Sequence, residues 1–178
     1  MDDARAPQRY PVVLRFMHWL IVAIVVVQFA VAWTMPEIHR GTPPTGLIDW
    51  HLSIGSTILA VMLGRLGWRL SHRVPPPPND LASSLRGLSR ITHYLLYALL
   101  IVIPLLGWAN ASARGWTVKL FGLIRLFPLL PTGSPIGRSL GDVHATLATA
   151  MLSVIALHVS GALYHAFVLG DGTVRRIT

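Results

Sequence analysis

Four long apolar segments, separated by stretches rich in proline, glycine and basic residues, organise this chain of 178 residues. Each segment is uncharged or nearly so over about 20 residues, enough for a helix rising ~1.5 Å per residue to cross ~30 Å of hydrocarbon. The pattern predicts an all-α membrane protein, a four-transmembrane-helix bundle that forms a single domain over residues 1–178. The predicted spans cover about residues 16–35, 49–68, 91–111 and 140–169.

Prolines and one aromatic stretch interrupt this pattern. Pro36 ends the first span, Pro75–Pro78 predict a stiff extended connector before the third, and Pro104 predicts a kink inside it. The longest loop precedes the fourth span, and we expect its amphipathic residues 118–130 to lie along the membrane surface. No small-residue cleavage site follows the first apolar run, so we expect the first span to stay in the mature protein.

Composition narrows both the class of protein and the class of cofactor. Only 12% of the residues are charged, whereas a soluble domain carries roughly 25%, so charge cannot cover a globular surface. The chain has no cysteine, which excludes disulfides, thiolate chemistry, iron–sulfur clusters and covalently attached haem within it. The net charge of +8 comes from basic residues lying mostly in loops beside the spans, which predicts contact with membrane lipids and no nucleic-acid binding.

The basic residues also predict the orientation of the bundle. An even number of spans places both termini on one side of the membrane. The side of the termini carries ten of the basic residues and the other side carries five. Because basic residues accumulate on the cytoplasmic side, we expect both termini in the cytoplasm. The five on the opposite side are Arg40, Arg114, Lys119, Arg125 and Arg138.

Histidine is the remaining candidate for cofactor chemistry, since eight histidines occur in this very apolar chain and ionisable residues within spans are functional candidates. His144 and His158 are 14 residues apart in the fourth span, about 40° short of four full helical turns. Both therefore lie on one helix face, ~21 Å apart along the axis, and His165 continues that face. One helix thus offers a metal ligand near each membrane surface.

Each of these ligands needs a partner at matching depth on another helix. His51 opens the second span on the side of His144, and His18 lies early in the first span on the side of His158. We therefore pair His51 with His144 and His18 with His158 as axial iron ligands of two b-type haems. Bis-histidine ligation leaves no open position on the iron, so such haems transfer electrons and do not readily bind oxygen.

Alternatives stay open for several residues. His93, early in the third span, is a rival to His18 as a ligand or else a quinone contact or structural residue, and His165 is a second rival. Arg65 is either a snorkelling charge or a contact for a haem propionate or a quinone head group. Gly55 and Gly161 either leave room for a flat macrocycle or mark ordinary helix crossings.

Short fragments, in fixed order over nearly the whole chain, make it resemble the bacterial cytochrome b561 family. These are four-helix, di-haem b cytochromes of the inner membrane that are linked to quinone. The fragments are RFMHWL at 15–20, WHLSIG at 50–55, HYLLY at 93–97, IPLLGW at 103–108, DVH at 142–144 and LH at 157–158.

The resemblance implies bis-histidine haems at His18, His51, His144 and His158. One branch of similar size is a superoxide:ubiquinone oxidoreductase, or superoxide oxidase, in which superoxide gives its electron on the periplasmic side and quinone is reduced near the cytoplasmic haem. In that branch the position matching His165 lies at the quinone site, assisted by a lysine between the second and third spans. This sequence has no lysine there.

The main hypothesis is therefore a multi-pass oxidoreductase of the bacterial inner membrane. Electrons from a periplasmic donor, superoxide by the resemblance, enter at the haem of His51 and His144. They cross to the haem of His18 and His158 and reduce ubiquinone near His165. Imidazole exchanges protons near neutral pH, which suits His165 to relay a proton to the quinone.

Two other functions remain in competition with this one. The chain could be a non-enzymatic cytochrome b membrane anchor and electron-transfer subunit of a larger dehydrogenase or hydrogenase, or a small transporter or proton channel without haem. Residues 113–139 carry four basic and no acidic residues, and their field would attract superoxide or, equally, lipid head groups.

Overall fold

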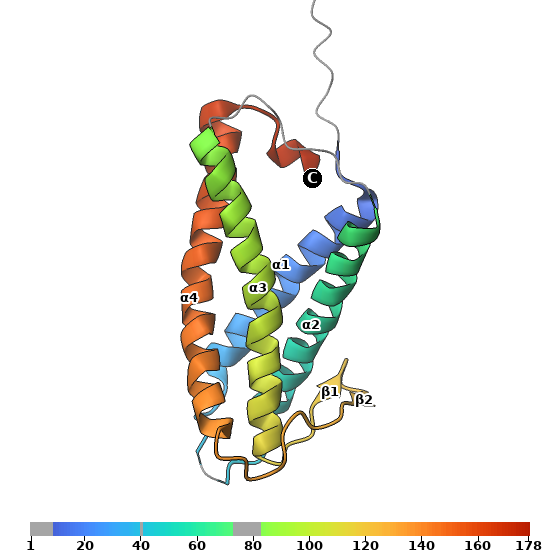
Figure 1. Ribbon diagram of the computed structural model, residues 1–178, viewed down its shortest axis with the longest axis vertical. Coiled ribbons are helices and arrows are strands. Elements are labelled where there is room, and N and C mark those ends of the chain that lie inside the picture. Colours follow the sequence, from blue (N-terminus) through green and yellow to red (C-terminus); the bar gives the residue numbers. More distant parts are fainter. Residues whose placement is uncertain (1–8, 40, 73–82) are drawn as a thin grey trace, which may run out of the picture.

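Four long helices form an elongated bundle in the computed structural model, which describes residues 9–39, 41–72 and 83–178 (Figure 1). Two strands of two residues each pair between α3 and α4, and two short helical segments follow α4. The elements are α1 (Val12–Thr34), α2 (Leu47–Ser71), α3 (Ser83–Ala113), β1 (Lys119–Leu120), β2 (Ile124–Arg125), α4 (Gly137–Tyr164), the π-helix η1 (His165–Leu169) and the 3-10 helix η2 (Val174–Arg176).

The four predicted spans are confirmed as helices, and each is long and apolar enough to cross a membrane. Many large apolar side chains point outward from the bundle; Phe16 is 65% exposed and Val26 64%. Exposed apolar surface on this scale is unfavourable in water and favourable against lipid tails. The exterior as well as the length of the helices therefore fits a membrane protein.

The helix ends differ from the predicted spans in a systematic way. α3 begins at Ser83, eight residues before the predicted start of the third span. The apolar run marks the part of a helix that fits hydrocarbon, whereas its hydrogen-bonded turns extend into the polar layer. The fourth span reaches Leu169 as predicted, but its last turn is the π-helix η1, which Gly170 ends with a φ of 60°.

The helices contact one another in chain order. α1 packs on α2, α2 on α3, and α3 most extensively on α4. In the described part of the chain, α4 makes only sparse backbone contact with α1 or α2. The small core lies between α1 and α2, where Ile21, Ile58 and Met62 are buried. The first and last helices, α1 and α4, therefore do not pack extensively on each other.

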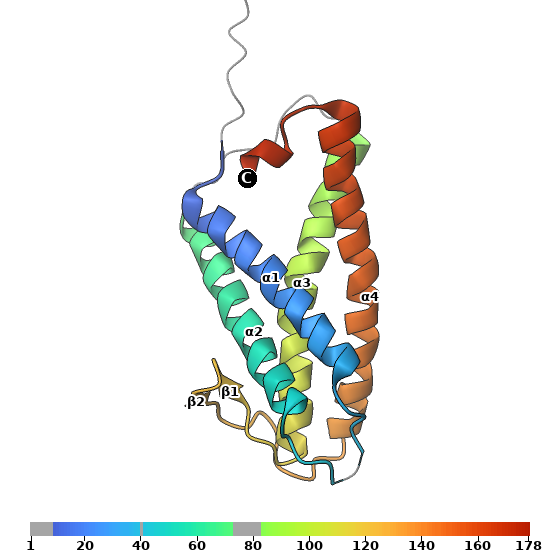
Figure 2. The ribbon, with the colours of Figure 1, turned by 180° about the vertical axis from the view of Figure 1, so that it is seen from behind.

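Both ends of the described chain lie at one end of the bundle (Figure 2). The Tyr10 backbone N–H donates to the Arg176 carbonyl at 3.0 Å, and the Trp19 indole N–H donates to the Ile177 carbonyl at 3.1 Å. This agrees with an even number of spans. Placement of that end in the cytoplasm stays a prediction, and the connector at Pro75–Pro78 lies outside the described residues.

The aromatic stretch predicted along the membrane surface contains the β1–β2 hairpin, which the sequence pattern did not reveal. Its three-residue turn uses Phe121 and Gly122 at φ values of 53° and 71°. The Ser56 hydroxyl on α2 donates to the Lys119 carbonyl at 2.8 Å. The hairpin is therefore held against α2, at the end of the bundle opposite the termini (Figure 1).

The orientation can be tested with single cysteines, because the chain has none of its own. Glu37 is exposed at the end opposite the termini, and Thr178 is the exposed last residue. A membrane-impermeant maleimide should label Glu37→Cys in intact cells and Thr178→Cys only after permeabilisation. The reverse labelling pattern would place the termini outside the cytoplasm.

Candidate functional site

His51 on α2 and His144 on α4 face each other, with ring centroids 6.0 Å apart. A nitrogen–metal bond of about 2 Å, plus roughly 1 Å from ring centroid to nitrogen, puts two imidazoles on one metal roughly 6 Å apart. The observed spacing therefore suits two rings that ligate one iron from opposite sides. The two helices that carry these rings do not pack closely on each other.

The His144 ring is oriented by a hydrogen bond from Nδ1 to the Ile103 carbonyl at 2.8 Å. A carbonyl only accepts, so Nδ1 carries the hydrogen and Nε2 keeps the lone pair that a metal needs. Gly107 provides space for this ring, since a Cβ there would lie 3.0 Å from ring atoms. Neither Ile103 nor Gly107 was predicted as part of the site. The order Ile103-Pro104-Leu-Leu-Gly107 was noted only as a family fragment.

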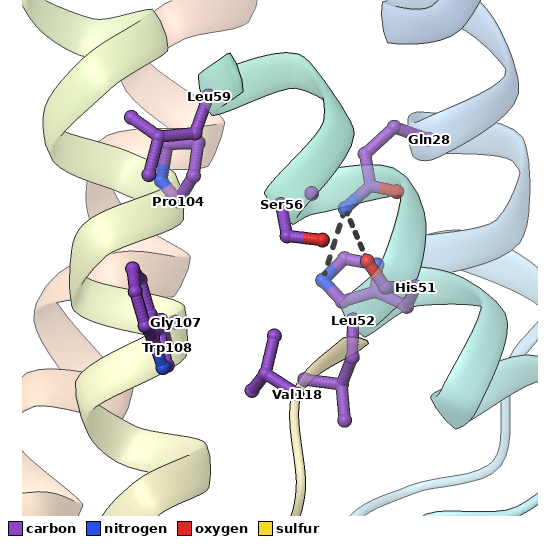
Figure 3. A pocket seen from close by; sticks show the side chains of 10 residues that line it. Gln28, His51, Leu52, Ser56, Leu59, Pro104, Gly107, Trp108 and Val118 are labelled. Carbon is purple, nitrogen blue, oxygen red and sulfur yellow. Dashed lines mark hydrogen bonds between the residues drawn. The ribbon is translucent and has the colours of Figure 1, made fainter. Parts of the chain in front are cut away.

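A pocket beside His51 is lined by residues of α1, α2 and α3 and by Val118 (Figure 3). Gln28 on α1 donates from Nε2 to the His51 carbonyl at 3.1 Å and lies 3.4 Å from His51 Nε2. His51 Nδ1 is buried without a hydrogen-bond partner in the described structure. Gly55 borders Gln28, whose Nε2 would lie 3.3 Å from an added Cβ. Gln28 was missed because a lone glutamine in a span carries no spacing signal.

His18 on α1 and His158 on α4 form a second pair, with centroids 6.4 Å apart. The rival His93 is nearer, at 5.0 Å from His158, and its Nδ1 lies 2.6 Å from the Ser89 carbonyl. Because two metal–nitrogen bonds need roughly 6 Å between centroids, the spacing favours His18 over His93 as the partner of His158. His93 lies beside the pair.

Arg65 joins three helices near this second pair. Its Nη1 donates to the Leu14 carbonyl of α1 at 2.6 Å, and its Nε donates to the Tyr97 hydroxyl of α3 at 3.0 Å. The structure adds a third possibility to the two open alternatives for Arg65, because its guanidinium makes hydrogen bonds inside the bundle. A charge in a span is expensive unless its hydrogen bonds are met, and these bonds meet part of that need.

His165, the second rival, contacts none of the other histidines in the described structure. Its Nδ1 lies 2.6 Å from Asp171 Oδ2, and both side chains are largely buried, at 12% and 22% exposed. Burial by itself would raise the pKa of Asp171, but hydrogen bonds from Thr173 and His165 outweigh it and hold this pKa below its usual value. Asp171 was missed, although a carboxylate just beyond a span-terminal histidine was visible in the sequence.

The positive loop opposite the termini is partly neutralised by a residue outside it. Lys119 Nζ lies 3.8 Å from the Asp49 carboxylate of α2. Arg114 donates to Asn110 and lies over the Trp116 ring. A count of charges within the loop therefore overstates its field, because it leaves out the carboxylate that α2 brings to it.

Comparison with known proteins identifies the family. The prokaryotic cytochrome b561 family model matches residues 9–178. The chain is 32% identical over 169 residues to the probable superoxide oxidase CybB of Yersinia pestis, covering 90% of each chain. It is 28% identical over 181 residues to cytochrome b561 homolog 2 of Escherichia coli K12, covering 99% of this chain and 95% of the relative.

A more distant similarity is 24% identity over 171 residues to cytochrome b562 of Cereibacter sphaeroides, covering 90% of this chain and 89% of that protein. The matches extend over all four helices rather than one motif. Together with four helices able to cross a membrane, they agree with the predicted location in the bacterial inner membrane. The chain belongs to the prokaryotic cytochrome b561 family, the multi-pass membrane electron-transfer proteins that bind haem b.

Proposed function

We propose that this protein holds two b haems, one between His51 and His144 and one between His18 and His158. The observation that carries this proposal is the pair of centroid spacings, 6.0 Å and 6.4 Å, both close to the roughly 6 Å that two ligands of one iron require. The two α4 histidines lie ~21 Å apart along the axis, so the sites are near opposite surfaces.

The donor sets and the helix packing fit the cofactor. Within residues 9–39, 41–72 and 83–178, no three histidine, cysteine or acidic side chains converge as ligands of a bare metal ion. A haem needs only two, since its macrocycle fills the other four positions. α4 packs only sparsely on α1 and α2, and the proposed ligand pairs are among the side chains that meet between these helices.

The residues of the chain have definable roles around such a cofactor. The Ile103 carbonyl fixes the His144 tautomer, and Gly107 admits the ring. The bound haems supply reversible one-electron carriers at two depths. The protein supplies two histidines on each, which close the iron to other ligands, and an apolar shell that excludes water.

We further propose superoxide as the donor and ubiquinone as the acceptor. A relative at 32% identity is named a probable superoxide oxidase. Exposed Arg125 lies on the hairpin that Ser56 bonds to α2, the helix that carries His51. Two superoxide anions lose one electron each to give two molecules of oxygen. One quinone takes both electrons and two protons to give quinol, with His165 donating at the end of the bundle near the termini.

The second candidate is an electron-transfer anchor subunit of a larger dehydrogenase or hydrogenase. The observation in its favour is the exposed apolar surface of the hairpin region, where Leu123 is 83% exposed and Phe127 69%. A docked periplasmic partner would cover such a surface. Copurification of that partner, with poor haem reduction by superoxide alone, would favour this function.

Haem content tests the ligand pairs. The purified protein should contain two b haems per chain, counted by dithionite-reduced minus air-oxidised spectra and haem extraction. His144→Ala should retain only the haem of His18 and His158, because the proposed haem between His51 and His144 loses a ligand. His39→Ala, at an exposed histidine, is the matched control and should retain two.

The same measurement of haem content distinguishes His18 from His93 as the ligand paired with His158. His18→Ala should lose one haem, whereas His93→Ala should keep both, because the 5.0 Å spacing is too short for an iron between His93 and His158. The opposite result would make His93 the ligand. A chain with no haem after expression with adequate haem supply would leave the transporter or channel as the better function.

Superoxide capture should depend on Arg125. Arg125→Glu is expected to slow haem reduction by superoxide roughly 2–10-fold at low ionic strength, because the local field that attracts the anion is weakened. The difference should shrink as salt screens the field. Arg175→Glu changes an exposed arginine at the other end and is the control. Equal rates for both variants would exclude steering at this loop.

Quinone reduction should depend on His165. His165→Gln is expected to slow quinone reduction by roughly 10²–10⁴, the usual contribution of a general acid, while both haem spectra stay intact. His72→Gln removes an exposed histidine near the same end, stacked on Trp68, and is the control. Unchanged kinetics in His165→Gln would refute this role.

A further inference from the structure

The C-terminal segment turns back over the end of the bundle near the termini. Gly170 reverses the chain after η1, and η2 brings the last residues to α1 (Figure 1). There the Ile177 carbonyl accepts from Trp19 and the Arg176 carbonyl accepts from Tyr10. We call residues 170–178 the C-terminal strap. The strap therefore links the end of α4 to the helix that carries His18.

Asp171 is the first residue of the strap after its turn, and both of its carboxylate oxygens are engaged. Oδ2 lies 2.6 Å from His165 Nδ1, and Oδ1 accepts the Thr173 backbone N–H at 2.9 Å. The Thr173 bond fixes the carboxylate independently of the histidine. The Asp171 carboxylate is therefore held in place as a hydrogen-bond acceptor for His165 Nδ1.

This contact selects one tautomer of His165. An ionised carboxylate only accepts hydrogen bonds, so Nδ1 must carry the hydrogen that lies between the two groups. Nε2 is then the nitrogen free to exchange a proton with another molecule. A carboxylate on the far nitrogen also stabilises the imidazolium form, which exists between the step in which Nε2 gains a proton and the step in which Nε2 gives that proton up.

We propose that Asp171 is the positioning residue for proton donation by His165 to the quinone, an inference that rests on the proposed function. As the two electrons reach the quinone, an Nε2–H bond of His165 breaks and an O–H bond forms on a quinone oxygen. The other hydrogen stays on Nδ1 throughout and remains hydrogen-bonded to Asp171. Nε2 regains a proton from water at the end of the bundle that carries the termini. The same proton donation then takes place at the second quinone oxygen.

A purely structural role for the pair makes a different prediction. The bonds of the strap to Trp19 and Tyr10 do not involve the Asp171 carboxylate. If the pair served only to fasten the strap, its loss would loosen the strap and leave the chemistry at His165 unchanged. If Asp171 orients His165, its loss slows proton donation while the strap stays in place.

The test is Asp171→Asn in the full-length, haem-loaded protein, with ubiquinone as the acceptor. The maximal rate of quinone reduction should fall about 10–100-fold, by analogy with removal of the hydrogen-bond partner of a metal-bound histidine, while the KM for quinone changes little. Haem content and haem reduction by superoxide should match the parent. Asp171→Glu should recover part of the rate because it restores a carboxylate.

Two controls separate positioning from folding. Glu37→Gln removes an exposed carboxylate at the other end of the bundle and should leave quinone reduction unchanged. The labelling rate of Ile177→Cys, a partly buried position of the strap beside Trp19, should be the same with Asp171 and with Asn, which shows that the strap stays in place. Nitrogen-15 NMR should show His165 with hydrogen on Nδ1 in the parent and a loss of that preference in Asp171→Asn.

The outcomes distinguish the inference from the function beneath it. A parent protein that reduces no quinone overturns the proposed function and this inference with it. A parent that reduces quinone equally fast with Asp171 and with Asn overturns the inference alone. A slower Asp171→Asn variant whose strap cysteine has become freely labelled would assign the residue a structural role instead.

Discussion

Polar groups inside hydrocarbon have no water to bond, and the arrangement of this bundle depends on that constraint. The His144 ring is bonded to the Ile103 carbonyl, Arg65 to the Leu14 carbonyl and the Tyr97 hydroxyl, and Gln28 to the His51 backbone. Each bond joins two different helices. The same polar side chains that serve the proposed cofactor sites are therefore also the groups that fix the helices relative to one another.

α4 places the two proposed electron-transfer sites in series. It carries one histidine of each close pair, and its continuation carries His165 on the π-helix η1. The partners come from α1 and α2, which run antiparallel and so offer His18 and His51 at opposite ends (Figure 2). α4 alone thus fixes the separation of the two proposed sites, while α1 and α2 each supply the second histidine of one site.

The spans could be predicted from the lengths of the apolar runs. The facing histidines could be predicted from helical periodicity in the fourth span and from matched depth in the other spans. A helix repeats at a fixed angle, so His144 and His158 must share a face. Contacts that depend on a particular packing could not be predicted: Gln28 with His51, Gly107 beside His144, and Asp171 with His165. The proposal of His18 rather than His93 as the partner of His158 likewise rests on the distances, since both residues lie at similar depth.

The sequential packing of the helices has a consequence for assembly in the cell. α4 is held closely by α3 alone, while α1 is held by α2. Inserted helices can therefore form two hairpins that associate through α2 and α3 before α4 is fixed against α1. Haem arrival would complete that last association. On this proposal, a chain made without haem would keep α4 attached through α3 alone, so that the supply of haem would limit how much of the newly made protein reaches its final fold.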